Sequence, residues 1–352
     1  MRSARVVIGA NFGDEGKGLA VDALAARLDR PMVVRFNGGG QAGHTVAAPD
    51  GRRHVFSHVG AAALQGVPTF LSRFFVVHPG VFRREAAELA ALGVVPEVLV
   101  DPDALVTTPF DVVVNQWLEE ARGAGRHGSV GLGFGETIER ATRGFPLAVR
   151  DLPWRDESLA IIRESWVPLR LAELGLTIDE GRKTVLEARL AAFRDDVRAF
   201  LDMTRIGSID LAAARRDLVF EGAQGLLLDQ DRGHVFPHVT RSNTGLKNVL
   251  ALAEDLGLEH LDVTYMTRAY LTRHGAGPLP NERDIAGHVA VVDPTNRPNA
   301  WQGSLRFAPL DLDLMARTVA ADLGDAAGRI AVTAGLGLTC LDQLGPRVEI
   351  AT

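Results

Sequence analysis

Cysteine is almost missing from this 352-residue sequence, and its scarcity excludes an internal disulfide. Cys340 has no second thiol to pair with, so the chain suits a reducing cytoplasm. No apolar run approaches the length of a membrane span, and residues 6–10 lead straight into a glycine-rich turn. We therefore expect neither a membrane helix nor a cleaved signal segment. Positive charge is not in excess either. The formal net charge of −6 gives no overall attraction to nucleic acid or anionic membranes, so any phosphate must be bound by local groups.

The residues that are present can bury a large α/β core. Apolar residues make up 46% of the chain and charged residues 23%. Short β-branched or apolar runs lead repeatedly into glycine turns and then into residues with helical spacing. This pattern predicts one large α/β domain over residues 1–352, built around a mostly parallel sheet with ligand loops like those of P-loop proteins. Residues from about 158 to 202 have helical spacing and dense charge, which predicts an excursion of two surface helices that separate near residues 175–177.

Other helices are expected at 81–92 and from Thr108 to about Arg122. Thr108 suits the N-cap and Pro109 the first helical position. Three histidines between residues 54 and 78 lack the spacing of a zinc site, so their default is a surface or hydrogen-bonded role.

Two glycine-rich loops follow the first two predicted strands. Residues 6–8 form a buried strand, and the turn after it contains Gly13, Asp14, Glu15, Gly16, Lys17 and Gly18. Such a turn brings backbone N–H groups and a helix start to one point, and Lys17 adds a mobile positive charge, so the turn suits a phosphate. The second loop, residues 38–45, follows the strand at 32–36 and contains Gln41, Gly43 and His44. Both loops leave the edge of the sheet at which ligands bind in α/β proteins.

The first loop departs from the P-loop pattern at one position. Gly18 stands where that motif has the Ser or Thr hydroxyl that binds magnesium, so a metal needs another ligand, and Asp14 is the candidate. In the simpler interpretation, Asp14 and Glu15 are first-turn charges that the helix dipole favours.

These loops resemble a known family. GDEGKG at residues 13–18 and GGxxAGHT at residues 38–45 closely resemble the N-terminal signature of adenylosuccinate synthetase. The segments beginning at Glu221 (EGAQG) and at Val263 resemble later motifs of the same family, the second of them VTKAYTTRVGxGPFP. The resemblance implies an enzyme that joins L-aspartate to C6 of inosine monophosphate (IMP), using the γ-phosphate of GTP and Mg²⁺.

The resemblance also implies roles for individual residues. Asp14 is the expected general base, His44 donates a hydrogen bond or proton to the transferring phosphoryl group, and Lys17 holds charge. Mg²⁺ is expected on Asp14 and the carbonyl of Gly43. The expected nucleotide-binding residues are Gly13, Glu15, Gly16, Gly18, Gln41, Ser129, Arg143, Gln224, Thr240, Arg273 and Asp342. Ser129 belongs to a loop with six glycines in residues 123–136, expected to be mobile. Arg143 implies a homodimer in which it reaches across the interface to the partner's nucleotide.

The chain departs from the family in three places. The arginine-dense loop that clamps aspartate is replaced by a segment in which Thr295, Arg297 and Arg306 are the remaining candidates. Cys340 replaces the lysine of the guanine-recognition motif, and most of the usual C-terminal portion is absent. These departures resemble the phage branch of the family, which acts on dGMP. They favour dGMP with ATP or dATP, whereas the retained Asp14 favours IMP with GTP. Three departures outweigh one retained residue, so the predicted reaction is the succinylation of dGMP for 2-aminoadenine synthesis, and the IMP reaction is the alternative.

An alternative from another functional class is a nucleotide-binding switch that only senses or hydrolyses a triphosphate. Such a module needs the first loop alone. Gln224, Thr240 and Arg143 indicate a second polar site, so the ligase is the preferred hypothesis.

Overall fold

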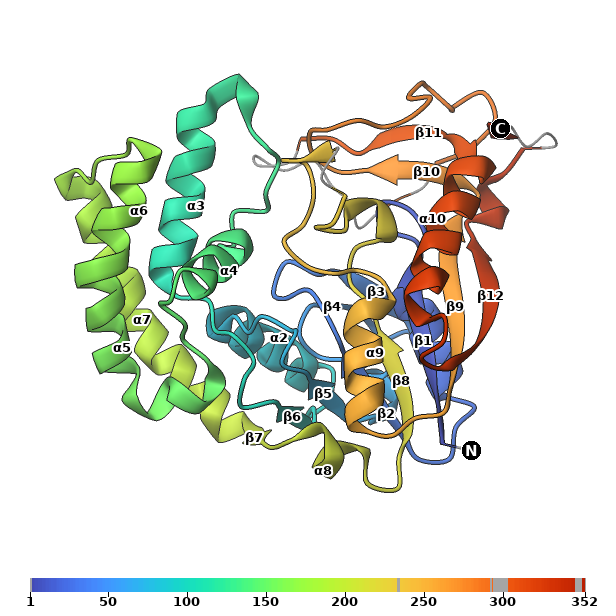
Figure 1. Cartoon of the computed structure of the whole chain (residues 1–352), viewed down its shortest axis with the longest axis horizontal. Helices are drawn as coiled ribbons and strands as arrows, with labels where there is room; N and C mark the ends of the chain where they lie inside the picture. Colours follow the sequence, from blue (N-terminus) through green and yellow to red (C-terminus); the bar gives the residue numbers. More distant parts are fainter. Residues whose placement is uncertain (1, 233–234, 292, 294–302, 346–349, 352) are drawn as a thin grey trace.

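The computed structural model describes residues 2–232, 235–291, 293, 303–345 and 350–351. Its centre is an eight-stranded sheet with the order β12-β9-β1-β8-β2-β5-β6-β7, and every pairing within it is parallel. A three-stranded sheet, β10-β11-β13, and the antiparallel pair β3-β4 complete the strands of this part of the chain. The predicted α/β fold around a mostly parallel sheet is confirmed (Figure 1).

The strands have these bounds: β1 (Ser3–Gly9), β2 (Pro31–Arg35), β3 (His44–Ala47), β4 (Arg53–Phe56), β5 (Thr69–Leu71), β6 (Val98–Val100), β7 (Thr204–Ile206), β8 (Asp217–Glu221), β9 (His260–Arg268), β10 (Tyr270–Arg273), β11 (Arg306–Asp311), β12 (Ala331–Thr339) and β13 (Ile350–Ala351). The α-helices are α1 (Lys17–Ala25), α2 (Pro79–Ala91), α3 (Pro109–Arg122), α4 (Phe134–Thr142), α5 (Arg155–Ile161), α6 (Val167–Leu174), α7 (Glu180–Met203), α8 (Ile209–Ala213), α9 (Leu246–Asp255) and α10 (Leu312–Ala326). In the described part of the chain, no helix combines the length and apolar character needed to cross a lipid bilayer.

The central strands are apolar because the sheet is covered on both faces. Val6 and Val7 are fully buried, as expected for a strand inside a parallel sheet. Side chains alternate along a strand, so Val7 and Val33 belong to one apolar cluster, and Val6 and Val34 belong to another. The two clusters lie on opposite faces of the same sheet.

Capping residues explain where two of the predicted helices begin. The backbone N–H of Thr108 donates to Asp111 Oδ2 at 2.8 Å, and Thr108 Oγ1 accepts from the Asp111 N–H, which is a capping box at the predicted start of α3. α2 begins at Pro79, earlier than predicted, because the side chain of His78 accepts from the Val81 N–H and caps the helix.

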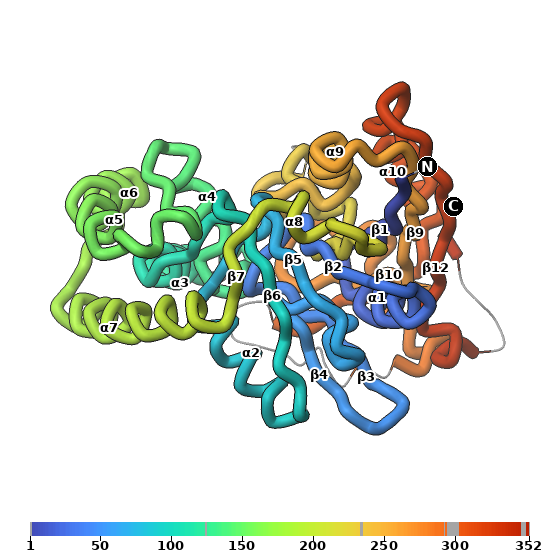
Figure 2. The backbone as a smooth tube through the Cα atoms, turned by 90° about the horizontal axis from the view of Figure 1, so that it is seen from below, coloured from blue at the N-terminus to red at the C-terminus, as the bar shows by residue number. Residues whose placement is uncertain are grey.

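The predicted helical excursion lies beside the sheet, on the left of Figure 1. α6 ends where predicted, since Gly175 adopts a left-handed conformation with φ 64°. α7 leads directly into β7, the edge strand that pairs with β6. Figure 2 shows α7 running along this side of the molecule toward β7. Phe193 and Phe200 of α7 belong to the same buried cluster as the strands, so the excursion is packed into the main core.

Candidate active site

Neighbouring strands of the sheet end at one edge, and the loops that follow them contact one another. β1 pairs with β8 on one side and with β9 on the other, and β2 pairs with β8. The loops after β1 and β8 pack closely: Leu227 donates its N–H to the carbonyl of Asn11 at 2.8 Å, and a Cβ on Gly225 would lie 2.4 Å from that carbonyl oxygen. This is the edge at which parallel α/β sheets bind ligands.

The side chain of Asn37 joins the loop after β2 to the loop after β8, which carries Gln224. The Asn37 side chain donates to the carbonyl of Ala223 at 3.0 Å and accepts from the Ala223 N–H at 2.7 Å. Gln224 has a left-handed backbone with φ 60°. In the described part of the chain, its buried Oε1 and both side-chain polar atoms of Gln41 have no hydrogen-bond partner. Buried amide groups are costly without partners, so these two glutamines indicate the place of a polar ligand. Sequence reasoning missed Asn37.

A buried histidine–carboxylate pair lies at the start of β3. His44 Nδ1 is hydrogen-bonded to Glu221 Oε1, and Glu221 Oε2 accepts from the Ala61 N–H at 3.0 Å. Burial lowers the pKa of His44, although the charge of Glu221 opposes the shift. Burial would raise the pKa of Glu221, but the charges of Arg35 and His44 hold it below its ordinary value. At neutral pH the pair is therefore a neutral imidazole beside a carboxylate.

Lys17 is buried, which corrects the expectation of a mobile charge. Its side chain is only 3% exposed. Its Nζ lies beside the Glu15 carboxylate, and both groups lie against Gly9 at the end of β1. A Cβ added to Gly9 would be 2.2 Å from Glu15 Oε2 and 3.1 Å from Lys17 Nζ. Burial lowers the pKa of Lys17 and raises the pKa of Glu15 to about 8. Gly18, at the position of the missing P-loop hydroxyl, lets α1 approach β3, because a Cβ there would lie 2.9 Å from the Cβ of His44.

Asp14 is held from two directions. It has a left-handed backbone with φ 56°, and its carbonyl accepts a hydrogen bond from Arg268 Nε. Nε2 of His274 lies 3.2 Å from its carboxylate oxygen Oδ2. Burial would raise the pKa of Asp14, but the hydrogen bond and charge of His274, with the charges of Lys17 and Arg268, hold it below its ordinary value. The carboxylate is therefore ionised at neutral pH. Sequence reasoning missed both Arg268 and His274 as partners of Asp14.

The glycine-rich loop around Ser129 is tied to α3. The side chains of Ser129 and Asn115 exchange hydrogen bonds of 3.0 and 3.1 Å, and the Gly128 N–H donates to the buried Glu119 carboxylate at 3.1 Å. A Cβ on Gly128 would lie 2.9 Å from the Cα of Gly275, so this loop packs directly on the segment after β10. These contacts tie the loop to α3 and to the segment after β10.

The remaining predicted residues have different surroundings. Arg143 is half-exposed and pairs with Glu139 and Glu173 of its own chain. Arg273 and Arg306 are cross-strand neighbours in β10 and β11, and burial followed by the charge of Arg306 lowers the pKa of Arg273 to about 10.

Backbone carbonyls and one carboxylate are the partners of these two arginines. Arg273 donates to the carbonyls of Pro278 and His238, each at 2.7 Å. Arg306 pairs with Glu282 at 2.7 Å. Thr240 lies partly buried in the loop after β8, and Asp342 is exposed in a short turn after β12. Thr295 and Arg297 lie outside the described residues.

The donors for Mg²⁺ are few. Within the ranges that the structure describes, no three His, Cys, Asp or Glu side chains gather into a metal-binding cluster. Mg²⁺ usually takes one or two carboxylates and completes its shell with water and substrate phosphates. The ionised and partly exposed Asp14 carboxylate fits that requirement.

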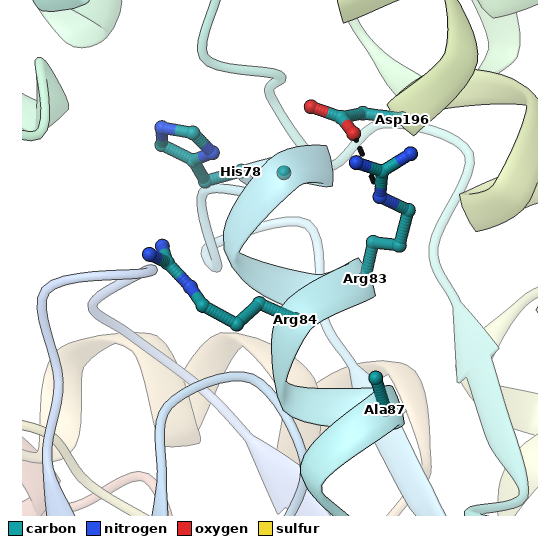
Figure 3. A pocket seen from close by; sticks show the side chains of 6 residues that line it. His78, Arg83, Arg84, Ala87 and Asp196 are labelled. Carbon is teal, nitrogen blue, oxygen red and sulfur yellow. Dashed lines mark ion pairs between the residues drawn. The ribbon is translucent and has the colours of Figure 1, made fainter. Parts of the chain in front are cut away.

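A hollow of about 710 Å³ lies at the start of α2 and is lined by His78, Gly80, Arg83, Arg84, Ala87 and Asp196. Arg83 Nε pairs with Asp196 Oδ1 at 3.0 Å, as Figure 3 shows. The hollow is lined by none of the residues of the strand-end site, so it is distinct from that site.

Comparisons with known proteins identify the family of this chain. A family model described as adenylosuccinate synthetase matches residues 6–301. The adenylosuccinate synthetase of Anaeromyxobacter sp. (strain Fw109-5) is 34% identical over 324 residues, which cover 85% of this chain and 72% of that protein.

Two solved structures share the fold. The fully ligated adenylosuccinate synthetase from Plasmodium falciparum has a TM-score of 0.72 at 20% identity, covering 95% of this chain and 76% of the other. The succinoaminodeoxyadenylate synthetase of cyanophage S-2L, bound to dGMP and dATP as an energy donor, has a TM-score of 0.61 at 16% identity, covering 96% and 84%.

The sequence relatives favour an ordinary adenylosuccinate synthetase over the dGMP enzyme that the departures had suggested. The phage enzyme is similar in fold but distant in sequence. The chain therefore belongs to the adenylosuccinate synthetase family.

Proposed function

We propose that this chain condenses L-aspartate with C6 of IMP, using the γ-phosphate of GTP. The observation that carries the proposal is the gathering of Asp14, Lys17 and the His44–Glu221 pair at the strand ends, beside the unpartnered amides of Gln41 and Gln224. Its family supports the same reaction. A nucleotide switch does not need this second set of polar groups.

In the first step the purine oxygen becomes a leaving group. The ionised Asp14 takes the N1 proton, charge shifts to O6, and O6 attacks the γ-phosphorus as GDP leaves. In the second step the aspartate amine attacks C6, the C6–O6 bond breaks, and phosphate departs with O6. Gln224 would bind the purine nucleotide by hydrogen bonds that add no charge, and Asn37 holds the loop of Gln224 in place through the Ala223 backbone.

The His44–Glu221 pair sets what His44 can donate. Because Nδ1 is hydrogen-bonded to the Glu221 carboxylate, a proton offered to the phosphoryl group must lie on Nε2. His44 is then an imidazolium, which the adjacent carboxylate stabilises. Lys17 adds positive charge beside the same loops, and the negative charge of bound phosphates favours its protonated form.

Mg²⁺ would be held by Asp14 and by the carbonyl of Gly43. When bound, it neutralises charge on the phosphates.

Other ligand contacts follow from the remaining residues. Ser129 and Thr240 would bind the 5′-phosphate, with Arg143 of a second copy in a homodimer. Arg306, together with Thr295 and Arg297, would bind the aspartate carboxylates.

A second candidate keeps the chemistry and changes the substrates to dGMP and ATP or dATP. Cys340 favours it, because a cysteine lacks the lysine stem that covers the guanine face of GTP. Both purines carry the N1–H and O6 that the first step uses, so they differ only around C2.

The test supplies L-aspartate and Mg²⁺ with IMP or dGMP, each with GTP and then ATP, and follows the succinylated product by mass spectrometry. We expect product from IMP with GTP. Turnover of dGMP alone would replace the first proposal with the second. Hydrolysis of the triphosphate without a succinylated product from either purine would favour the switch and overturn both.

A further inference from the structure

A histidine that the family motif does not carry contacts the proposed base. The segment after β10 resembles the motif RVGxGP, but His274 stands in the position of its valine. Nε2 of His274 lies 3.2 Å from Oδ2 of Asp14. A valine could make no hydrogen bond to this carboxylate.

Neighbouring residues hold the main chain on both sides of this contact. The main chain of Asp14 is held by Arg268, which in turn is hydrogen-bonded to Asp293 at 2.9 Å and to the Tyr270 hydroxyl at 3.2 Å. On the other side, Gly275 follows His274 directly with φ 69°, and its Cα lies against Gly128 of the glycine-rich loop. His274 therefore lies between the first catalytic loop and the glycine-rich loop, and its side chain is only 20% exposed.

We propose that His274 is a positioning residue for Asp14, and that its Nε2–H holds Oδ2 so that the other carboxylate oxygen takes the N1 proton of the purine. This inference rests on the proposed function. The main chain of Asp14 is anchored by Arg268, but its side chain must still be oriented about two torsions, and a donor on Oδ2 removes that freedom. Only a hydrogen-bond donor at this place is needed, and no change in the charge of His274 is invoked.

The test compares His274→Val with His274→Gln. Glutamine keeps an N–H donor at a similar distance from Cα, whereas valine is the residue of the family motif. His260→Val is the matched control, because His260 lies at the opposite end of the sheet, where it bonds Thr333. We expect His274→Val to lower kcat at least about tenfold, the effect of one hydrogen bond to a charged group. The KM for IMP should change less than about twofold, as for an interaction that acts in the chemical step. His274→Gln should recover most of the rate.

A double variant tests whether His274 acts through Asp14. In an Asp14→Asn background, adding His274→Val should lower the residual rate less than about twofold, because effects within one unit are not additive. The inference is overturned by a wild-type kcat in His274→Val, by a change in KM alone, by failure of His274→Gln to recover the rate, or by a full additional effect in the Asp14→Asn background.

A readout independent of turnover separates this inference from the proposed function. In ¹⁵N-labelled protein, Asp14→Asn should shift the His274 Nε2 resonance, and the His260 resonance should stay in place. An unshifted His274 resonance would refute the contact. Wild-type protein that binds purines without turning any of them over would instead refute the proposed function.

Discussion

Glu221 is the residue whose contacts bear most directly on the chemistry of His44. Replacing Glu221 with Gln keeps a hydrogen-bond acceptor but removes the charge that opposes the lowering of the His44 pKa. If His44 acts as an imidazolium, Glu221→Gln should reduce kcat about tenfold to a hundredfold, the range of a general acid. The rate should also begin to fall at a lower pH on the alkaline side, because the imidazolium loses its proton more easily.

The measurement is kcat against pH for wild type, Glu221→Gln and the control Glu254→Gln. Glu254 is a mostly exposed carboxylate that pairs with Arg329. An alkaline limb that stays in place in Glu221→Gln would contradict the assigned role of the pair.

Among individual residues, the sequence predicted those that lie in motifs and missed the residues that they contact. Asp14, Lys17 and His44 were predicted as site residues because glycine turns mark the loops that carry them. Asn37, Arg268 and His274 were missed as partners because each meets its neighbour only after the strands are ordered: His274 is 260 positions from Asp14 in the sequence. No spacing rule connects residues that far apart.

Arg140 connects α4 to α3 through a buried ion pair. Its Nε and Nη2 each lie 2.9 Å from an oxygen of Asp111, and both side chains have no exposed surface. Arg140→Met should therefore lower the free energy of unfolding by about 3–5 kcal/mol, because it leaves a buried carboxylate without its cation. Urea denaturation measures the loss. Arg163→Met, which removes a largely exposed pair with Glu187, should have little effect, and equal losses in the two variants would contradict this account.

Asp322 joins α10 to α9 and β9, and burial raises its pKa to about 6. It accepts from the Leu246 N–H and from the Tyr265 hydroxyl, each at 2.8 Å. Between these two pKa values, 3.8 in the unfolded chain and about 6 in the folded chain, only the folded chain keeps the proton on Asp322. The proton therefore stabilises the fold: this stabilisation is complete below pH 3.8 and disappears as the pH rises through 6. Its loss amounts to about 3 kcal/mol.

Asp322→Asn should abolish this part of the pH dependence. An asparagine still accepts from Leu246 and can donate to the tyrosine oxygen. Urea denaturation measures the free energy of unfolding at pH 4 and pH 7. The value for Asp322→Asn relative to wild type should be higher at pH 7 than at pH 4. Parallel pH dependences for the two proteins would contradict the raised pKa.

Elements with strong local signals were predicted well. The Thr108 cap and Pro109 predict the start of α3, and the valine runs predict the central strands. The order of those strands was not predictable, because register and neighbours depend on contacts between distant segments. β3 and β4 were also missed, since four-residue strands carry too little alternation to be recognised.

For the whole molecule, we propose a single domain over residues 1–352. The sheet interleaves segments from distant parts of the chain, since β1 lies between β8 and β9, and both apolar clusters pack on that one sheet. Differential scanning calorimetry should give one cooperative transition. Two separable transitions, with α5 to α7 unfolding first, would show that the excursion is an independent unit.

The central claim is that O6 of the purine is phosphorylated before aspartate displaces it. The direct measurement uses IMP labelled with ¹⁸O at O6, together with GTP, L-aspartate and Mg²⁺, and determines the isotope content of the released inorganic phosphate. The account predicts one ¹⁸O atom in each phosphate formed, in equal number to the succinylated product. Unlabelled phosphate alongside succinylated product would mean that O6 never bonds to phosphorus, and would contradict the account.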